Sequence, residues 1–295
     1  LAAAAVEALN RAAAPVLALD VPSGIDADTG TVMGAAVRAA ATVTFGAPKR
    51  GLTQEPARSH AGAVYVGHLG VPPDAPETAA LLTYTDAELP TRASDAHKGS
   101  AGRVAVIGGG HGREGAALLA SRAALRARAG LVTWLSYETP TLSSRLPEVM
   151  QAKLDGALPG NLDALVIGPG FFGSAGPNDA DHAQVLALAT EAACPAVLDA
   201  DALTALAATG QLRSLHSGPP RVLTPHPGEA ARLLGCSSQD IQADRFAAAQ
   251  RLADESGQTV VLKGPGTVIA TQSAPHLRVC PHGAPSLASG GTGDV

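Results

Sequence analysis

The residues with the clearest chemical potential are a glycine-rich run near the end of the chain and the carboxylate that follows it. Residues 289–294 read Ser-Gly-Gly-Thr-Gly-Asp, so three glycines precede Asp294. Because glycine has no Cβ, such a backbone can bring several N–H groups close to an anion. A carboxylate beside this anion hole can accept a proton from a hydroxyl group that attacks a phosphoryl group. Taken alone, the run fits a glycine-rich turn with a capping aspartate at least as well.

A lysine followed by two glycines is a second candidate. Lys263 ends an apolar run and begins the sequence Lys-Gly-Pro-Gly-Thr. An ammonium group acts as a point charge for phosphate, and the amides of a glycine-rich loop add hydrogen-bond donors. The motif indicates a nucleotide-phosphate site, although a lone lysine here is more often a solvated turn residue.

Two further loops at strand ends carry polar side chains. His226 lies between two prolines that would hold it rigidly, although a lone histidine is more often structural. Asp20 and Ser23 follow an apolar run near the N-terminus and offer a charge and a hydroxyl group. Ligands of open α/β sheets bind beyond the carboxyl ends of the strands. Both loops are therefore candidate binding sites.

Two glycine patterns match known nucleotide motifs only in part. Residues 46–51 have G-x-x-x-x-G spacing, but Leu-Thr follows where a P-loop has Lys-Ser/Thr. Residues 110–115 match G-x-G-x-x-G, and Glu138 follows about 20 residues later, as in Rossmann dehydrogenases. Gly108 and Gly109 separate this pattern from the preceding strand, so a Rossmann dehydrogenase is a minor alternative.

Alternating strand and helix signals supply the elements that must position these residues. Residues 103–107, 115–128 and 131–135 read as strand, helix and strand, which implies a parallel sheet with a right-handed crossover. Further strands are expected within residues 162–173, 194–203, 221–235 and 259–270, the last as a hairpin. From about Asp86 onward we therefore expect a three-layer α/β/α domain with a mainly parallel sheet.

The first section has strand signals of its own. We expect a helix to about Ala13, a strand over 16–19, strands within 41–52 and 61–72, and a proline-rich linker over 72–80. A length of 295 residues is enough for about two domains. This section therefore reads as part of a separate α/β domain.

Composition narrows the class of protein. The net charge of −5 gives no electrostatic footprint for nucleic acid or for an anionic membrane, and no apolar run approaches about 18 residues. Three scattered cysteines lack CxxC spacing, so we expect free thiols and a cytoplasmic location. The chain begins with Leu and lacks a basic start, which indicates an internal piece of a longer protein rather than a signal peptide.

Several motifs together resemble one known family. The second section resembles the ADP-dependent NAD(P)H-hydrate dehydratases, which have a ribokinase-like fold, through seven motifs in one order: DAHKGSAGR, GREGAALLASRAALRARAGLV, VIGPG, VLDADAL, LTPHPGE, VLKGPGT and SGGTGDV. The first section resembles the last third of the NAD(P)H-hydrate epimerase domain, a partial Rossmann-like α/β/α unit, through LALDVPSGIDADTG and VTFGAPKRGL. The resemblance implies an epimerase part over residues 1–82 and a dehydratase domain over 83–295, both truncated.

The resemblance also implies roles for individual residues. It assigns the adenine nucleotide, ADP or ATP, to Lys263, Gly264, Pro265, Gly266, Thr267 and Gly293. It assigns the hydrated cofactor, NADHX or NADPHX, to Gly115, Ala116, Gly170, His226 and Asp294, with Asp294 as the catalytic base. In the epimerase part, Asp20 would contact the hydrate and Ser23 would help to bind K⁺. Phe171 stands where the family usually has Leu, which leaves the shape of the wall beside the nicotinamide open.

The implied function is metabolite repair. A hydroxyl group of the hydrated ring would be phosphorylated from ADP, with Mg²⁺ bridging the nucleotide phosphates, and elimination would restore the dihydropyridine. The dehydratase would act on the S-form, and the intact protein would interconvert the R- and S-forms. By comparison with the family, the epimerase part lacks its phosphate loop and the dehydratase part lacks the helix after Asp294, so we expect no epimerisation and little turnover from this piece alone. We also expect a homo-oligomer.

Two other functions stay open. A ribokinase-like kinase for a sugar or vitamin would stop at a stable phosphorylated product. A non-catalytic NAD(P)H-binding module would bind nucleotide without turnover. The presence of Asp294 and Lys263 counts against the second of these.

Overall fold

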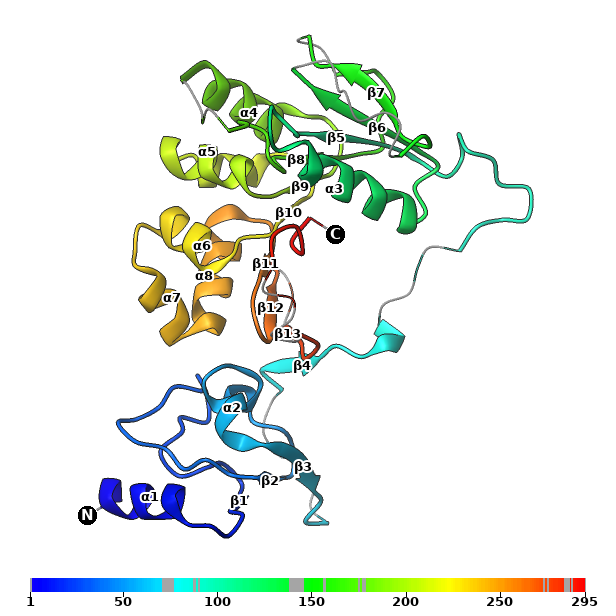
Figure 1. Ribbon diagram of the computed structural model, residues 1–295. Coiled ribbons are helices and arrows are strands. Elements are labelled where there is room, and N and C mark those ends of the chain that lie inside the picture. The colour runs from blue at the N-terminus through cyan, green and yellow to red at the C-terminus, as the bar shows by residue number, and fades with distance from the viewer. Residues whose placement is uncertain are drawn as a thin grey trace.

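The chain forms two β-sheets with helices around them, as the computed structural model shows (Figure 1). The structure describes residues 2–70, 77–86, 89, 91–137, 146–155, 158–174, 176, 179–272, 274, 276–283, 287 and 289–294. Glu138, which completes the dinucleotide pattern, lies outside these residues, and so do residues 72–76 of the expected linker.

The smaller sheet belongs to the N-terminal section, residues 2–67. Its three parallel strands, in the order β1-β2-β3, are accompanied by two α-helices and a short 3₁₀ helix: α1 (Ala2–Arg11), β1 (Leu17–Leu19), β2 (Ala41–Phe45), η1 (Arg50–Thr53), α2 (Ala57–Ala61) and β3 (Ala63–Gly67). The Thr42 hydroxyl donates to the Ala61 carbonyl oxygen (2.7 Å), which ties the end of α2 to the central strand. The strand expected within 61–72 is present as β3 at the edge of the sheet, and its first four residues are exposed.

The larger sheet has ten strands in the order β4-β13-β12-β11-β10-β9-β8-β5-β6-β7. Its pairings are parallel, except that β12 is antiparallel to both of its neighbours. The strands are β4 (Ala79–Leu81), β5 (Arg103–Ile107), β6 (Leu131–Ser136), β7 (Met150–Lys153), β8 (Ala164–Ile167), β9 (Ala196–Leu198), β10 (Arg221–Leu223), β11 (Thr259–Leu262), β12 (Thr267–Ala270) and β13 (Leu277–Cys280). The expected βαβ unit and the expected hairpin are both confirmed.

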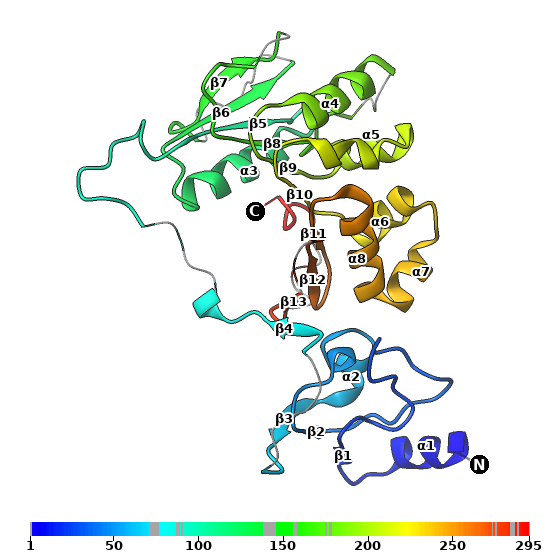
Figure 2. The ribbon, with the colours of Figure 1, turned by 180° about the vertical axis from the view of Figure 1, so that it is seen from behind.

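Helices cover both faces of this sheet. Helix α3 (Glu114–Arg126) lies on one face, and the helices of the other face are α4 (Asp179–Glu191), α5 (Asp201–Thr209), α6 (Pro227–Leu234), α7 (Ser238–Ala243) and α8 (Arg245–Ser256) (Figures 1 and 2). Two 3₁₀ helices, η2 (Tyr84–Asp86) and η4 (Leu212–Ser217), complete the described elements. The predicted three-layer α/β/α arrangement is therefore confirmed.

The core explains why polar residues appear where the strands end. Leu198, Leu223 and Leu262 are the last residues of β9, β10 and β11, and all three are fully buried. Since side chains alternate between the faces of a strand, these leucines anchor each strand end in the core while the chain leaves the sheet immediately afterwards. The next residues in each case, which include Asp199 and Lys263, emerge at one edge of the sheet.

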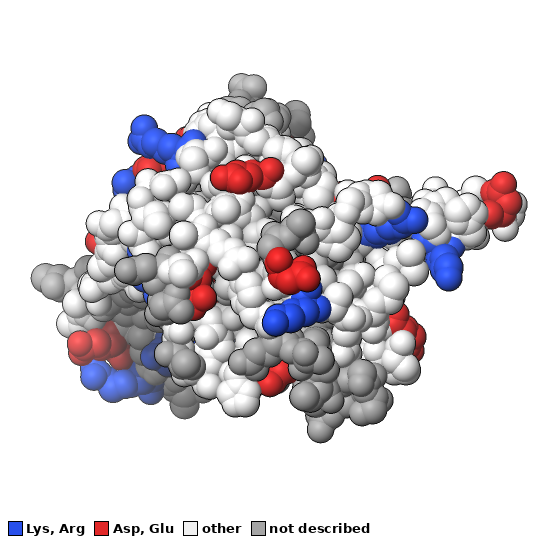
Figure 3. All heavy atoms as spheres, turned by 90° about the horizontal axis from the view of Figure 1, so that it is seen from above, with Lys and Arg blue, Asp and Glu red and all other residues white. Residues whose placement is uncertain are grey.

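On the face of the molecule seen in Figure 3, basic and acidic side chains of the described residues are interspersed among neutral ones, and neither kind forms a large patch. None of the described helices has the length and apolar character that crossing a membrane requires.

Candidate active site

The candidate site lies at the carboxyl ends of β9, β10 and β11. The Thr224 amide donates to the Leu198 carbonyl oxygen (3.1 Å), and the Lys263 amide donates to the Pro225 carbonyl oxygen (2.8 Å). These backbone bonds continue beyond the strands and fix the three loops against one another. The loops predicted separately from the sequence therefore meet at one edge of the sheet, as parallel strands require.

A buried ion pair stands at the centre of this edge. Lys263 Nζ lies 2.7 Å from Asp199 Oδ1, and the Asp199 side chain is only 8% exposed. A buried carboxylate is strongly disfavoured unless it is paired, so Lys263 offsets the cost of burying Asp199. Asp199 was not among the predicted site residues. Its position immediately after a short apolar strand, in Val-Leu-Asp-Ala-Asp, was the available signal.

The glycine-rich run lies against this ion pair. A Cβ added at Gly293 would lie 3.3 Å from Lys263 Nζ, which places the run in direct contact with the lysine. Burial raises the pKa of Asp294 above its ordinary value, and the charge of Asp199 raises it further, while Lys263 opposes the shift. A carboxylate with a raised pKa is a stronger base, as proton abstraction from a hydroxyl group requires.

The conformation of the run depends on its glycines. The Asp294 amide donates to the Gly291 carbonyl oxygen (3.2 Å), which closes a turn with Gly291 at a φ of 89°. A Cβ at Gly291 would lie 2.7 Å from Leu119 Cδ1 of helix α3. The Thr292 hydroxyl donates to the carbonyl oxygens of Leu287 and Ser289 (2.9 Å each). The turn therefore packs closely between α3 and Lys263, and larger residues would displace it.

His226 caps helix α6 beside this edge. Its Nδ1 accepts hydrogen bonds from the amides of Gly228 (3.0 Å) and Glu229 (3.3 Å), and Glu229 Oε2 accepts from the His226 amide (2.8 Å). Burial, Lys263 and Arg232 lower the pKa of His226, which favours the neutral ring that can accept these bonds. The side chain is 51% exposed, so one edge of the imidazole also faces outward. His226 thus has a structural role as a helix cap. The exposed edge of its ring is also available for the predicted contact with the hydrated cofactor.

The remaining predicted hydrate contacts lie at the adjacent strand ends of β5 and β8. The Gly110 amide donates to the Gly170 carbonyl oxygen (2.8 Å). Gly170 has a φ of 59°, and a Cβ there would lie 2.8 Å from the Cβ of Arg113 and 3.4 Å from that of Ala116. Gly115 follows in the first turn of α3, with open space around it. Gly170 and Ala116 are therefore close together, at the positively polarised end of the helix.

Phe171 and its aromatic neighbours form the wall beyond Gly170. The Phe171 ring is buried and packs edge-to-face against Tyr137 (5.1 Å between centroids) and Phe172 (5.6 Å). Burial raises the pKa of the Tyr137 hydroxyl, so this hydroxyl stays protonated. The ring of Phe171 therefore fills core space, and its backbone shapes the loop.

In the N-terminal section, Asp20 occupies a polar loop at the end of β1. Asp20 Oδ1 lies 2.7 Å from Lys49 Nζ and accepts from the Phe45 amide (3.1 Å). The hydrogen bond from Lys49 lowers the pKa of Asp20. Ser23 lies three residues later, where its carbonyl oxygen accepts from the Val37 amide (2.9 Å). The roles of both residues in hydrate and K⁺ binding remain predictions.

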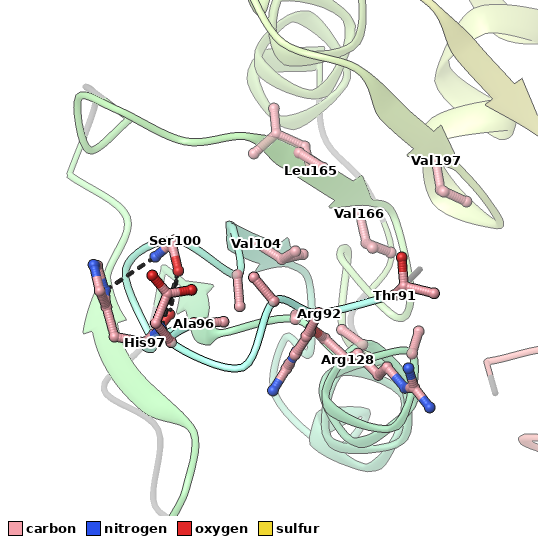
Figure 4. A pocket seen from close by; sticks show the side chains of 17 residues that line it. Thr91, Arg92, Ala96, His97, Ser100, Val104, Arg128, Leu165, Val166 and Val197 are labelled. Carbon is pink, nitrogen blue, oxygen red and sulfur yellow. Dashed lines mark hydrogen bonds between the residues drawn. The ribbon is translucent and has the colours of Figure 1, made fainter. Parts of the chain in front are cut away.

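A separate cavity lies away from all of these residues. A hollow of about 710 Å³ is bounded by the loop before β5, the end of α3 and the strands β5, β8 and β9 (Figure 4). His97 Nδ1 accepts from the Ser100 amide (3.2 Å) at its rim, and Val104, Val166 and Val197 lie along its sheet side. The hollow contains none of the predicted site residues.

Comparisons with known proteins identify the family of the chain. A family model described as NAD(P)H-hydrate dehydratase matches residues 104–295, and one described as YjeF-related protein N-terminus matches residues 1–51. The bifunctional NAD(P)H-hydrate repair enzyme Nnr of Coxiella burnetii is 42% identical over 98% of this chain and 60% of its own length. The enzyme of the same name from Escherichia coli is 39% identical over 98% of this chain and 56% of its own length. The chain thus spans about 60% of the length of such relatives.

Solved structures give the same result for the fold. The ADP/ATP-dependent NAD(P)H-hydrate dehydratase of Bacillus subtilis, co-crystallised with ATP and Mg²⁺, is 31% identical with a TM-score of 0.61, over 73% of this chain and 77% of that one. A ribokinase-like superfamily protein of Enterococcus faecalis is 25% identical with a TM-score of 0.63, over 73% of this chain and 76% of that one. Because the dehydratase model matches more than half of its residues, the chain belongs to the NAD(P)H-hydrate dehydratase family.

Proposed function

We propose that this chain dehydrates the S-form of hydrated NADH or NADPH with ADP or ATP as the phosphoryl donor. The observation that carries the proposal is the cluster of Lys263, Asp199 and Asp294 beside the glycine-rich turn, at the carboxyl edge of a ribokinase-like sheet. A cation, a glycine-rich turn and a base with a raised pKa are what phosphoryl transfer to a hydroxyl group requires. The similarity to named dehydratases supports this reaction over a sugar or vitamin kinase.

In the proposed reaction, Asp294 takes the proton of the ring hydroxyl as its oxygen attacks the terminal phosphorus of the nucleotide. The bond from that phosphorus to the bridging oxygen breaks, and ADP leaves as AMP. The C–O bond of the phosphate ester then breaks, phosphate leaves with the electron pair, a ring proton is lost, and the dihydropyridine double bond is restored. Hydroxide is a poor leaving group and phosphate is a good one, which explains why a nucleotide is consumed.

The nucleotide phosphates would be held by the Lys263 side chain, the backbone of the loop Lys263–Thr267, and Gly293. An ammonium group can exchange its partner from Asp199 to a phosphate oxygen without leaving the site. The hydrate would lie between Asp294 and the segment formed by Gly115, Ala116 and Gly170, with His226 at its edge. This placement follows the predicted assignments and the meeting of their loops at one edge of the sheet.

The described residues suit a magnesium ion that is carried by the nucleotide. No group of three or more His, Cys, Asp or Glu side chains in the described part of the chain is arranged to hold a metal. Mg²⁺ is commonly held by one or two carboxylates with substrate phosphates and water, so Asp199 would be a sufficient protein ligand while Asp294 acts as the base. When bound, the ion would neutralise charge on the phosphates.

The whole protein is proposed to carry two activities. The N-terminal section, residues 1–82, would be part of an epimerase in which Asp20 contacts the hydrate and Ser23 helps to bind K⁺, and residues 83–295 would form the dehydratase domain. A cytoplasmic location fits the free cysteines, and a homo-oligomer is carried over from the family resemblance.

Product analysis tests the proposal. The full-length protein is given chemically prepared NADHX with ADP, and the absorbance of the dihydronicotinamide ring and the nucleotides are followed together. We expect NADH, AMP and phosphate to appear in equal amounts, and no reaction without nucleotide. Accumulation of a stable phosphorylated compound would indicate a kinase, and binding of nucleotide without product would indicate a non-catalytic module.

A further inference from the structure

The N-terminal section contacts the proposed nucleotide loop of the larger domain, residues Lys263–Thr267, through a buried glutamine. Gln54, which follows η1, is fully buried, and its side-chain amide Nε2 donates to the Gly266 carbonyl oxygen (3.0 Å). Its Oε1 accepts from Arg245 Nε (2.9 Å) at the start of α8. The two halves of one amide therefore join the loop to a buried guanidinium group.

Arg245 completes this support from within the larger domain. Its Nη2 donates to the carbonyl oxygens of Leu262 (3.1 Å) and Lys263 (3.2 Å), and its Nη1 donates to Gln242 Oε1 (3.0 Å). Only 3% of Arg245 is exposed, and burial lowers its pKa to about 10, so the group still carries its charge at neutral pH. A charged donor to two successive carbonyl groups fixes the backbone at the point where the Lys263 side chain departs.

The glycines of the loop fit against these two residues. A Cβ at Gly264 would lie 3.0 Å from Arg245 Nη2, and a Cβ at Gly266 would lie 2.1 Å from the Thr53 carbonyl oxygen. Gly266 also has a φ of 65°. Close packing against the N-terminal section thus gives Gly266 a reason to be glycine that is independent of phosphate binding.

A second contact fixes the N-terminal section itself on the same helix. The Arg50 guanidinium lies 5.2 Å from the centre of the Phe246 ring, a cation–π geometry. The Thr53 hydroxyl donates to the Arg50 carbonyl oxygen (2.6 Å), which closes the turn that presents Gln54. Residues 50–54 are therefore built as a unit against Arg245 and Phe246.

We infer that Gln54 and Arg245 are positioning residues for the loop Lys263–Thr267, so that the N-terminal section completes the nucleotide site of the larger domain. The inference rests on the proposed function only in taking this loop as the nucleotide loop. Its consequence is that a segment of the proposed epimerase part also determines how well the dehydratase binds nucleotide.

The test replaces Gln54 in the full-length protein and follows the loop directly. Gln54→Ala removes the hydrogen bonds to Gly266 and Arg245, together with a local one to Thr53 Oγ1 (3.0 Å), whereas Gln54→Glu keeps an acceptor for Arg245 and places an anionic oxygen against the Gly266 carbonyl oxygen. Gln258→Ala is the matched control, because Gln258 is also buried at the opposite end of β11. Its side chain bonds to two backbone groups, the Arg221 amide (2.7 Å) and the Leu215 carbonyl oxygen (2.6 Å). Hydrogen–deuterium exchange at residues 263–267 without nucleotide is the first readout, and the dissociation constant of ADP is the second.

We expect both Gln54 variants to exchange faster at residues 263–267 and to bind ADP about tenfold more weakly, since loss of one or two buried hydrogen bonds is of this size. Gln258→Ala should leave both values near those of the wild type, whatever its effect on overall stability. Unchanged exchange at 263–267 in the Gln54 variants would overturn the inference. If the wild type itself does not bind ADP but the Gln54 variants still exchange faster, the proposed function is contradicted. The positioning role of Gln54 is then still supported.

Discussion

At the scale of single residues, the proposed chemistry depends on three neighbouring charged side chains. Asp199 pairs with Lys263, and it also raises the pKa of Asp294 through its own negative charge. Lys263 in turn lowers the pKa of Asp294 and of His226. The strength of the proposed base is therefore set by its neighbours as well as by burial.

Replacing Asp199 should change the pH profile of turnover. In Asp199→Asn the negative charge beside Asp294 is lost, so the pKa of Asp294 falls and the acidic limb of the kcat profile moves to lower pH. The measurement is kcat against pH for the wild type, for Asp199→Asn and for the control Asp163→Asn, whose carboxylate bonds to the Arg103 amide at the start of β5. An acidic limb that stays in place would show that Asp294 is not the group that titrates.

Replacing Lys263 should weaken nucleotide binding more than the chemical step. A hydrogen bond to a charged group is worth about 1.5–3 kcal/mol, so Lys263→Ala should raise the dissociation constant of ADP about 10–100-fold. Calorimetric titration gives this constant, and kcat at saturating ADP gives the chemical step. A large loss of kcat with unchanged affinity would move Lys263 from binding to catalysis.

At the scale of elements, helix α6 depends on His226 for its start. The cap combines two bonds to Nδ1 with the reciprocal bond from the His226 amide to Glu229, and Pro227 occupies the first helical position. A lost N-cap typically costs about 1 kcal/mol, and a neutral imidazole is needed to accept the bonds. His226 therefore stabilises helix α6 and also lies at the edge of the candidate site.

The free energy of unfolding of the wild type should fall as the pH drops. A variant whose cap contains no histidine should lack this part of the pH dependence. Because the folded protein lowers the pKa of His226, the unfolded chain binds more protons between that lowered value and the ordinary pKa of histidine. Stability is thus fully present above the ordinary pKa and is lost as pH falls through this window. Glu229 acts in the opposite sense, because burial raises its pKa.

Urea unfolding at several pH values in the absence of ligand measures the effect. His226→Ala should lose about 1 kcal/mol at neutral pH, and His226→Asn should keep most of the cap and lose the pH dependence due to the histidine. If the difference between wild type and His226→Asn does not change with pH, the cap does not depend on the protonation of the ring.

The elements of the larger domain were largely predictable from the sequence, whereas the contacts between distant residues were not. Strand–helix–strand signals placed β5, α3 and β6, and the turn glycines placed the hairpin of β11 and β12. The strands β4, β7 and β13 were not predicted. β4 overlaps the end of the expected linker, is three residues long and pairs with β13 at the edge of the sheet. Asp199 and Lys263 are 64 positions apart, and Gln54 and Gly266 are 212 apart, so no local pattern could join them.

At the scale of the whole molecule, the N-terminal section and the ten-stranded sheet meet at the nucleotide loop. The three-stranded sheet lies beyond β4 at one end of the larger domain, and residues 50–54 reach the turn between β11 and β12 (Figure 1). Gly266 stands at this meeting point. A substitution there therefore reports on whether the two sections are packed together in solution.

Gly266→Ala should destabilise the protein more than Gly210→Ala. Both glycines have a φ of 65°, so alanine costs about 1–2 kcal/mol of backbone strain at either position. A Cβ at Gly210 would meet nothing within 4 Å, whereas one at Gly266 would clash with the Thr53 carbonyl oxygen at 2.1 Å. The comparison uses the free energy of unfolding in urea. Equal losses would show that the Thr53–Gly266 contact does not persist in solution.

The most direct test of the proposed dehydratase is Asp294→Asn in the full-length protein, supplied with NADHX and ADP. The asparagine keeps the shape and the hydrogen-bonding reach of the side chain but cannot accept a proton. Recovery of dihydronicotinamide absorbance gives kcat, and titration with ADP gives the dissociation constant. We predict that kcat falls about 10²–10⁴-fold, as for other positioned bases, with little change in nucleotide affinity. A variant that turns over near the rate of the wild type would contradict the account, because the base would then lie elsewhere.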